Sequence, residues 1–241
     1  MRQQVAVLAA GRGTRLGRPH PKPLTRLNDG QTILGAQLDR IRTAFDRPQV
    51  YVVVGFKLEM ILEAHPDVLF VYNEAYDETN TSKSLLRALR ATGDGGVLWM
   101  NGDVVFDPAL LALTIPLITA DQSFIAVNTD RVADEEVKYT VDDAGWIKEL
   151  SKSVVGGLGE AFGVNYVAER DKAALIARLD EVDTQDYFER GIELSIELDG
   201  VRFAALDISA LPAVEVDTPE DLDRANASLA NHSDQKRRTT P

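Results

Sequence analysis

Short apolar runs alternate with amphipathic segments in the first third of the chain. Residues 5–8 and 50–54 are continuous apolar runs, which are typical of strands buried on both faces of a parallel sheet. Residues 33–45 place apolar side chains at helical spacing, and a short helix over 58–63 and a strand over 68–72 follow. This βαβα order predicts a Rossmann-like, three-layer α/β/α fold with a mainly parallel mixed sheet.

The alternation continues with one interruption, over residues 129–163. There, two short strands over 139–141 and 147–150 flank a turn at 142–145, which predicts a small antiparallel hairpin, and the glycines over 156–159 indicate a flexible lid. Elsewhere we predict helices over 82–90, 108–118, 172–179 and 186–198, and strands over 96–101, 123–127, 164–168, 201–207 and 213–217.

The length of 241 residues fits one domain with a small elaboration. We therefore expect a single domain over residues 1–230, in which the segment 129–163 is an insert that covers the substrate side of the site. Residues 231–241 are polar, and we expect them to form a flexible tail.

Composition narrows the range of functions. The net charge of -12 argues against a nucleic-acid partner, and no apolar run is long enough to span a bilayer. With no cysteine and 3 histidines, carboxylates are the expected metal ligands, which suits Mg²⁺. The first residues lack the cleavage site of a signal peptide. We expect a cytoplasmic protein with small-molecule partners, and the sequence leaves a homodimer open.

The stretch over 8–24, LAAGRGTRLGRPHPKPL, follows the first predicted strand and is the main sign of chemistry. Glycine lets the backbone bend sharply and approach a ligand, and the N–H groups freed by such a bend form an anion-binding concavity. Arginine and lysine side chains add fixed positive charge. We therefore predict a polyphosphate site. Its glycines and cations are Gly11, Gly13, Gly17, Arg12, Arg15 and Lys22.

Two common phosphate-binding loops do not fit this stretch. A Walker loop requires lysine and then serine or threonine after its last glycine, but Gly17 is followed by Arg18 and Pro19. The dinucleotide fingerprint requires a third glycine where this chain has Leu16. A surface turn is the plain alternative, although strand, glycines, arginines and the string Pro21-Lys22-Pro23 occur together in the right order.

Asp103 lies just past the predicted strand over 96–101. Ligands of open α/β sheets bind at the carboxyl ends of the strands, and a carboxylate in such a crevice needs a partner. We therefore predict that Asp103 binds Mg²⁺. A turn or capping role is the alternative, but Asp107 is already available to cap the next helix.

Two strings in the sequence resemble the signature of nucleotidyltransferases that activate phosphorylated small molecules with an NTP. The first is Gly11-Arg12-Gly13-Thr14-Arg15-Leu16 followed by Pro21-Lys22-Pro23-Leu24, and the second is VDTPEDL over 216–222. The resemblance extends over residues 5–230. It implies the fold of nucleotide-diphospho-sugar transferases, Mg²⁺ as cofactor, and Asp217 as the second metal ligand. An N-cap role for Asp217 is the alternative, because a helix follows it.

Weaker strings resemble the branch that transfers a cytidylyl group to phosphocholine or phosphonates. They are NTSKSL over 80–85, Glu136-Val137-Lys138, Ser151-Lys152 and GEAFG over 159–163. The plain alternatives are helix capping by residues 80–82 and a solvated charged hairpin. The resemblance implies CTP as the nucleotide and a small phosphonate or phosphorylated alcohol as the acceptor.

The resemblance also implies roles for individual residues. Backbone amides near residues 11–14 and the Arg15 side chain hold the β- and γ-phosphates, Lys22 contacts the α-phosphate, and Asp103 and Asp217 hold Mg²⁺. Residues expected around the nucleotide are Leu8, Ala9, Ala10, Gly11, Arg12, Gly13, Thr14, Asn80, Thr81, Ser82 and Gly102, and those expected around the acceptor are Lys138, Lys152, Glu160 and Tyr187.

The nature of the acceptor is the finest expectation. A choline group would need an aromatic cage, but Tyr187 and Phe188 beside Glu189 are neighbours on a predicted helix and face different directions. Lys138 and Lys152 suit a more anionic acceptor, such as a phosphonate that carries a carboxylate. We therefore place phosphonates slightly ahead of phosphocholine.

Two other functions stay open at this point. One is a sugar-1-phosphate nucleotidyltransferase that uses UTP, GTP or dTTP, although the segment 16–21 between Arg15 and Lys22 is shorter than in many such enzymes. The other is a nucleotide-binding regulatory domain without turnover. The presence of Lys22, Asp103 and Asp217 together argues against the second alternative.

Overall fold

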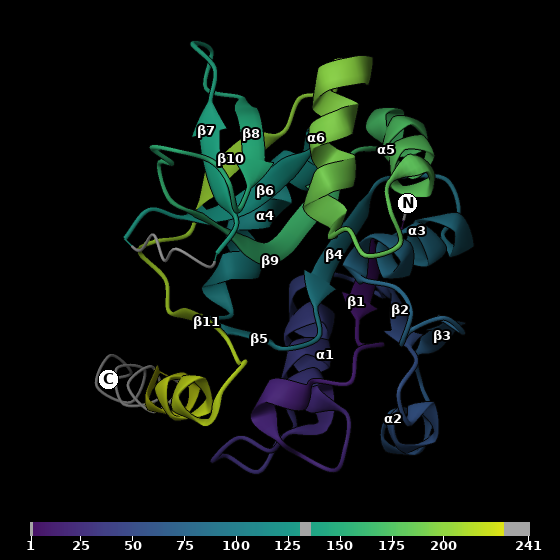
Figure 1. The fold of residues 1–241 in the computed structure, drawn as a ribbon. Helices are drawn as coiled ribbons and strands as arrows, with labels where there is room; N and C mark the ends of the chain where they lie inside the picture. Colours follow the sequence, from purple (N-terminus) through teal and green to yellow (C-terminus); the bar gives the residue numbers. More distant parts are fainter. Residues whose placement is uncertain (1, 131–135, 229–241) are drawn as a thin grey trace.

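A computed structural model describes residues 2–130 and 136–228. The predicted tail over 231–241 lies outside the described residues. In the described part, a central sheet runs in the order β10-β6-β9-β4-β1-β2-β3 (Figure 1). Its strands are β1 (Gln4–Leu8), β2 (Gln49–Val54), β3 (Leu69–Tyr72), β4 (Val97–Asn101), β6 (Phe124–Asn128), β9 (Glu160–Val167) and β10 (Ala204–Asp207).

The sheet is parallel except at β9, which runs antiparallel to both of its neighbours, β4 and β6. The hairpin of β7 (Lys138–Val141) and β8 (Ile147–Ser151) joins the sheet at β9, where Lys138 pairs with Glu160, and at β10, where Trp146 forms a bridge with Ala204. The predicted fold class, a mainly parallel mixed sheet with a small antiparallel insert, is therefore confirmed.

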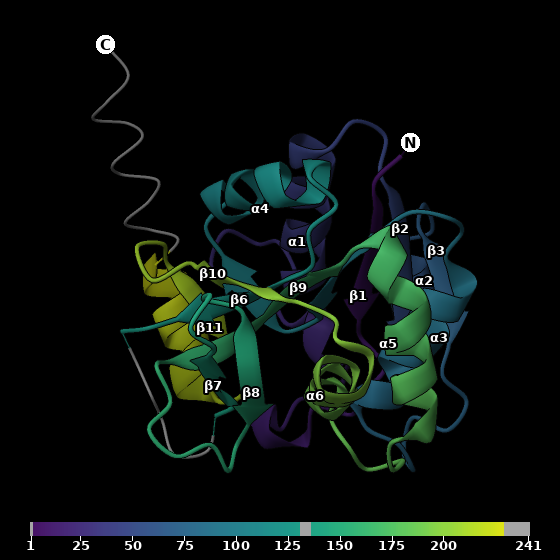
Figure 2. The ribbon, with the colours of Figure 1, turned by 90° about the horizontal axis from the view of Figure 1, so that it is seen from above.

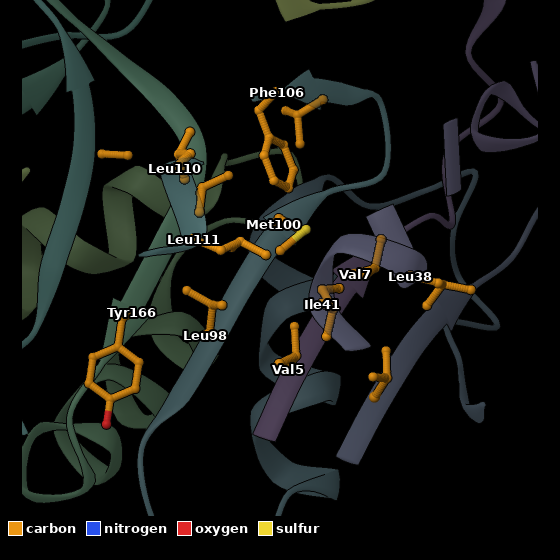
Figure 3. Close-up of a cluster of buried hydrophobic side chains, with 14 of the residues drawn as sticks. Val5, Val7, Leu38, Ile41, Leu98, Met100, Phe106, Leu110, Leu111 and Tyr166 are labelled. Carbon is orange, nitrogen blue, oxygen red and sulfur yellow. The ribbon is translucent and has the colours of Figure 1, made fainter. Parts of the chain in front are cut away.

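Helices cover both faces of the sheet (Figure 2). Alternate residues of β1 enter two different cores: Val5 and Val7 pack with α1, α2 and α4, while Ala6 and Leu8 pack with α3, α5 and α6. Figure 3 shows part of the first core. The helices are α1 (Ile33–Ala44), α2 (Leu58–Ala64), α3 (Thr81–Ala91), α4 (Ala109–Thr119), α5 (Glu169–Glu181) and α6 (Phe188–Asp199).

The side chains of β1 point alternately to the two faces of the sheet, and helices cover both faces. This explains why the sequence shows a continuous apolar run there. A strand that is buried on both faces has no polar side, so all five residues of β1 are buried. The same reason accounts for the buried runs in β2 and β4. These central strands are the elements whose type the sequence predicts best.

The start of β9 is where the structure corrects the prediction. The strand expected over 164–168 begins at Glu160, so residues 160–163, which we expected at the end of the insert, belong to β9. The string Glu160-Ala161-Phe162-Gly163 contains no run of β-branched or apolar residues that would indicate a strand, and pairing with β6 and β7 sets its conformation. The strand expected over 201–207 begins at Ala204, three residues late.

A second, two-stranded sheet pairs β5 (Val104–Phe106) antiparallel with β11 (Ala213–Glu215). The prediction extended the last strand to residue 217 and did not include β5. A further helix begins at residue 219 and reaches residue 228, the end of the described part. No helix in the described ranges is long and apolar enough to cross a membrane.

Candidate active site

One cavity of about 380 Å³ opens where β1 and β4 end. Leu8 and Asn101 pair across these strands, and both line the cavity. The lining combines segments from the two ends of the chain. Its members are Leu8, Ala9, Gly11, Gly13, Thr14, Arg15, Lys22, Pro23, Asn80, Thr81, Asn101, Gly102, Asp103, Glu136, Val137, Lys152, Ala161, Gly163, Tyr187, Phe188, Glu189, Glu215 and Asp217.

The glycine loop packs directly against Lys22. Gly13 precedes the short 3-10 helix Thr14–Leu16 and has a φ of 59°, a left-handed conformation that favours glycine. A Cβ atom at this position would lie 2.7 Å from Cβ of Lys22, closer than side-chain carbons can approach. Lys22 lies between Pro21 and Pro23 and is the first residue of a second 3-10 helix, Lys22–Leu24. Gly13 therefore lets the loop close onto the lysine.

Lys22 lies between two carboxylates. Its Nζ atom donates to Oδ2 of Asp103 at 2.7 Å and to Oδ1 of Asp217, and only 9% of the side chain is exposed. Burial by itself would lower the pKa of Lys22, but Asp103 and Asp217 outweigh it and the pKa is raised overall. Arg15 approaches the same group, with NH1 3.3 Å from Oδ2 of Asp217.

Asp103 is not used as a helix cap. It follows Gly102, whose N–H donates to the Leu8 carbonyl at 2.8 Å and so ties the ends of β4 and β1 together. Asp107 makes the capping contact at α4 by accepting from the Ala109 N–H at 2.8 Å. The Oδ1 atom of Asp103 is buried and has no hydrogen-bond partner among the described residues.

Asp217 is likewise free of the capping role that its position allows. Asp221 accepts from the backbone N–H groups of Asp217 and Thr218, while the Thr218 hydroxyl accepts from the Asp221 N–H at 3.2 Å. This reciprocal pair caps the helix that starts at residue 219. The Val216 N–H donates to the Asp103 carbonyl at 3.0 Å, which fixes the two aspartates side by side.

These carboxylates fit a hard divalent cation. Asp103 and Asp217 lie close enough to share one ammonium, and the buried Oδ1 of Asp103 lacks a partner among the described residues. No group of three or more His, Cys, Asp or Glu residues in the described part is arranged to hold a metal. Two carboxylates are a common protein contribution to Mg²⁺ sites that also use nucleotide phosphates.

Residues 80–82 combine a capping role with a place at the cavity. Asn80 caps α3 by accepting from the Thr81 N–H at 2.8 Å, as the plain alternative expects. The Thr81 hydroxyl accepts from the Phe188 N–H at 3.2 Å, which joins α3 to α6. Asn80 and Thr81 line the cavity, whereas Ser82 is buried behind them.

Of the two lysines predicted to face the acceptor, only Lys152 lines the cavity. Its Nζ atom lies 4.9 Å from the centre of the Tyr187 ring. Lys138 and Glu160 pair across β7 and β9, outside the lining, and Lys138 donates to the Lys152 carbonyl at 3.4 Å. β9 directs Ala161 and Gly163, not Glu160, to the cavity, because alternate residues of a strand face opposite sides.

Three more predicted residues lie at or behind the edge of the site. Ala10 and Ser82 are buried, and Arg12 contacts Asp77 at 3.3 Å on the surface. None of the three lines the cavity. Gly17 of the predicted polyphosphate site is also absent from the lining. The other predicted residues line the cavity, namely Leu8, Ala9, Gly11, Gly13, Thr14, Arg15, Lys22, Asn80, Thr81, Gly102, Asp103, Lys152, Tyr187 and Asp217.

Sequence reasoning missed Asn101 and Glu215. Glu215 accepts from the Gly163 N–H at 2.8 Å, and a Cβ atom at Gly163 would lie 2.6 Å from the Asn101 amide nitrogen. Burial, reinforced by Asp103 and Glu136, raises the pKa of Glu215 well above its usual value. The predicted strand over 213–217 contains a usable signal, since Glu215, the last residue of β11, lies two residues before Asp217 and strand alternation places such residues on one side.

Comparison with known proteins gives a family and a fold. A sequence model of the family described as "MobA-like NTP transferase domain" matches residues 5–181. The CMP-5'-(3-aminopropyl)phosphonate synthase of Streptomyces rubellomurinus is 30% identical over 266 aligned positions, which cover 97% of this chain and 40% of the relative. The chain therefore spans about 40% of that relative's length.

Solved structures of similar fold carry several activities. The CTP:phosphocholine cytidylyltransferase of Streptococcus pneumoniae has a TM-score of 0.74 at 18% identity, covering 95% of this chain and 100% of its own. The inositol-1-phosphate CTP transferase of T. maritima has a TM-score of 0.73 at 17% identity, with coverages of 93% and 95%. A UDP-glucose pyrophosphorylase has a TM-score of 0.74 at 14% identity, with coverages of 96% and 100%. These likenesses show the fold alone.

Proposed function

Since this chain belongs to the family of MobA-like NTP transferase domains, we propose that it transfers a cytidylyl group from CTP to a small phosphonate or phosphorylated alcohol and releases pyrophosphate. The observation that carries the proposal is the cluster of Lys22, Asp103 and Asp217 beside a glycine loop in one cavity. An ammonium and two carboxylates at one point suit charge neutralisation at the α-phosphorus during transfer, which a domain that only binds nucleotides does not need.

The nucleotide end of the cavity is the glycine loop. Backbone N–H groups near residues 11–14 would bind the β- and γ-phosphates together with Arg15, whose side chain is two-thirds exposed and can reach a ligand. Ala9, Asn80 and Thr81 would surround the base and ribose. Lys22 would contact the α-phosphate and stabilise the charge that grows there during transfer.

Asp103 and Asp217 would hold Mg²⁺ through carboxylate oxygens, of which Oδ1 of Asp103 is buried and unpartnered in the described structure. When bound, the ion would neutralise phosphate charge and act as a Lewis acid at the α-phosphorus. The chain's own part is to keep the two carboxylates together. The hydrogen bond from the Val216 N–H to the Asp103 carbonyl and the separate Asp221 cap both serve this purpose.

The reaction is an in-line displacement at the α-phosphorus. An oxygen of the acceptor phosphonate or phosphate forms a bond to the α-phosphorus, and the bond from that phosphorus to the bridging oxygen breaks. Pyrophosphate leaves with the bonding electron pair. The protein contributes position and charge neutralisation and needs no covalent intermediate.

The choice of CTP and of a phosphonate acceptor draws support from the relative named as a CMP-5'-(3-aminopropyl)phosphonate synthase. Sugar-1-phosphate transfer is the second candidate. It is favoured by one observation, that a UDP-glucose pyrophosphorylase matches the fold as well as the cytidylyltransferases do.

A pyrophosphate-release screen tests the proposal. Purified protein with Mg²⁺ is combined with CTP, UTP, GTP or dTTP and with propylphosphonate, 3-aminopropylphosphonate, phosphocholine or glucose-1-phosphate. We expect release only with CTP and a phosphonate or phosphocholine. Release with glucose-1-phosphate and UTP alone would support the sugar candidate instead, and no release with any pair would contradict both.

A further inference from the structure

Glu189 is a carboxylate in the cavity that the proposed mechanism does not use. It lies in the first turn of α6 and lines the cavity, and its Oε2 atom is buried without a hydrogen-bond partner among the described residues. A buried carboxylate oxygen without a hydrogen-bond partner costs free energy, so this Oε2 atom in a cavity requires an explanation. A positively charged ligand group would remove that cost when it binds.

The surroundings of Glu189 are acidic. Among lining residues, three side chains are cationic (Arg15, Lys22 and Lys152) and five are acidic (Asp103, Glu136, Glu189, Glu215 and Asp217). Arg15 and Lys22 are both engaged by Asp217, at the nucleotide end. At the other end, Lys152 is the single cation among the lining residues. A second negative group on the acceptor would therefore meet like charge there.

Lys152 shows how an ammonium can be accommodated in this region. Its Nζ atom lies over the Tyr187 ring at 4.9 Å from the ring centre, within the range of a cation–π contact. Lys152 also acts electrostatically on Glu189. Tyr187 and Glu189 both belong to the start of α6, which packs beside β8 (Figure 1). Lys152 is exposed, so its ammonium can move away when a ligand enters.

We propose that Glu189 binds a positively charged amino group of the acceptor, and that Tyr187 provides an aromatic surface beside it. The acceptor is thus a phosphonate or phosphate monoester with an ammonium tail, and not one with a second anionic group. This inference rests on the proposed function and names the substrate class of that site. It replaces the expectation of a carboxylate-bearing acceptor, which depended on Lys138 facing the cavity.

Because Glu189 must be ionised to bind an ammonium group, the proposal also predicts a pH dependence of acceptor binding. Burial, the largest influence, raises its pKa to about 7; Glu193 and Glu136 act in the same direction, and its own backbone N–H and Lys152 act against it. An ammonium ligand favours the ionised carboxylate. Binding of an amino acceptor should therefore weaken as the pH falls through 7, because a protonated Glu189 carries no charge.

The test compares three acceptors of matched length at saturating CTP and Mg²⁺. They are 3-aminopropylphosphonate, propylphosphonate and 3-phosphonopropionate, whose tails are cationic, neutral and anionic. In the wild type we expect kcat/KM for the amino acceptor to exceed that for the neutral one by about 10- to 100-fold, the range of a charge-assisted hydrogen bond. The anionic acceptor should be the poorest.

Two variants of α6 test the assignment to Glu189. Glu189→Gln should reduce the preference for the amino acceptor to less than about threefold, mainly through KM. Glu197→Gln is the matched control, because Glu197 is exposed on the same helix and lies outside the cavity lining. Between pH 8 and pH 6, the ratio of the amino KM to the neutral KM should rise about tenfold in the wild type and stay flat in Glu189→Gln. The phosphonate group titrates in both acceptors, and the ratio measured in Glu189→Gln supplies the correction for any difference in its ionisation.

The outcomes separate this inference from the proposed function. If CTP gives no pyrophosphate release with any acceptor, the proposed function fails and the inference fails with it. If all three acceptors turn over at similar kcat/KM, the function stands and the inference is overturned. A Glu189→Gln variant that keeps the full preference also overturns it. The wild-type acceptor series is decisive even if the variant does not fold.

Discussion

Lys22 is a residue whose local geometry depends on both ends of the chain. Its ammonium contacts Asp103 and Asp217, which lie 81 and 195 positions away, and Gly13 packs against its side chain. Because the pKa of Lys22 is raised, the group stays charged throughout the neutral range. It is therefore available as a fixed cation for the α-phosphate in the proposed mechanism.

Lys22→Ala should lower kcat by about a hundredfold or more, because one charge contact in the transition state is lost. Steady-state pyrophosphate release with CTP measures the effect. Lys148→Ala is the control, since Lys148 is an exposed lysine on β8 outside the cavity lining. A Lys22→Ala variant that folds and retains a kcat near that of the wild type would exclude the lysine from the mechanism.

Asp103→Asn and Asp217→Asn should each abolish turnover and weaken binding of a divalent cation, because carboxylate oxygens are the ligands that Mg²⁺ prefers. Titration of Mn²⁺ in the presence of CTP, followed by electron paramagnetic resonance, gives a readout independent of activity. Asp143→Asn, in the exposed hairpin turn, is the control. Unchanged Mn²⁺ affinity in either variant would assign that aspartate a purely structural role.

Among the elements, the β5–β11 sheet and the helix after it hold the chain segments on either side of Asp217. β11 pairs with β5 directly after Asp103, and the chain then enters a helix that Thr218 and Asp221 cap. This cap leaves the Asp217 carboxylate available for Lys22 and Arg15. The hydrogen bonds at the N-terminus of this helix therefore position Asp217, which lies just before the helix.

Asp221→Ala should destabilise the fold by about 1 kcal/mol, as the loss of a helix cap does, and should also lower kcat because Asp217 loses its fixed backbone. Urea unfolding and pyrophosphate release measure the two effects. Asp223→Ala, two residues further along the same helix and exposed, is the control. Equal midpoints for Asp221→Ala and Asp223→Ala would show that the cap does not contribute.

The same cap predicts a pH dependence. Burial would raise the pKa of Asp221, but hydrogen bonds from Thr218, Arg224 and Asp217 outweigh it, so the pKa is lowered overall. A carboxylate whose pKa is lower in the folded state stabilises the fold above its unfolded pKa of about 4, and this contribution is lost as the pH falls through the folded value. The stability difference between wild type and Asp221→Ala should therefore shrink below about pH 4. A difference that stays constant down to pH 2 would contradict this.

For the whole molecule, the cavity joins distant parts of the chain. Its lining reaches from Leu8 to Asp217, and the helices on one face of the sheet, α3 and α6, meet at the Thr81–Phe188 hydrogen bond beside it. A ligand that binds there contacts groups that are together only in the folded state. Ligand binding should consequently stabilise the entire domain.

CTP with Mg²⁺ at about a hundredfold over its Kd should raise the free energy of unfolding by about 2.7 kcal/mol and the Tm by about 5–10 °C for a domain of this size. Differential scanning fluorimetry measures the shift. UTP and GTP at the same concentration are the matched ligands, and smaller shifts with them would support CTP as the nucleotide. An equal shift with all three would contradict that choice.

Elements whose character depends on local composition could be predicted from the sequence. The runs that became β1, β2 and β4 are apolar throughout because both faces are covered, and α1 shows its spacing because one face is exposed. β9 could not be predicted over its full length. Three of its first four residues, Glu160, Ala161 and Gly163, have small or polar side chains, and their strand conformation comes from pairing with β6 and β7.

The residues of the candidate site also divide into those that local sequence could single out and those that only the folded structure identifies. The glycine loop, Lys22 and Asp103 could be singled out because phosphate and metal binding require particular residue types next to a strand. Glu189 and Glu215 could not, since a glutamate in a helix or strand is ordinarily solvent-exposed and nothing local shows that it is buried. Lys138 and Glu160 were chosen on resemblance, and only the pairing of β7 with β9 shows that they lie outside the cavity.

The sequence by itself determined the fold class and singled out the glycine loop and the two aspartates proposed to hold Mg²⁺, because each of these depends on local residue types and their periodicity. Only the tertiary structure decided which side chains meet. It placed Lys22 between two aspartates and left Oε2 of Glu189 buried in the cavity without a hydrogen-bond partner among the described residues. Such contacts depend on strand order and on the burial of each group, and neither quantity is encoded in a short stretch of sequence.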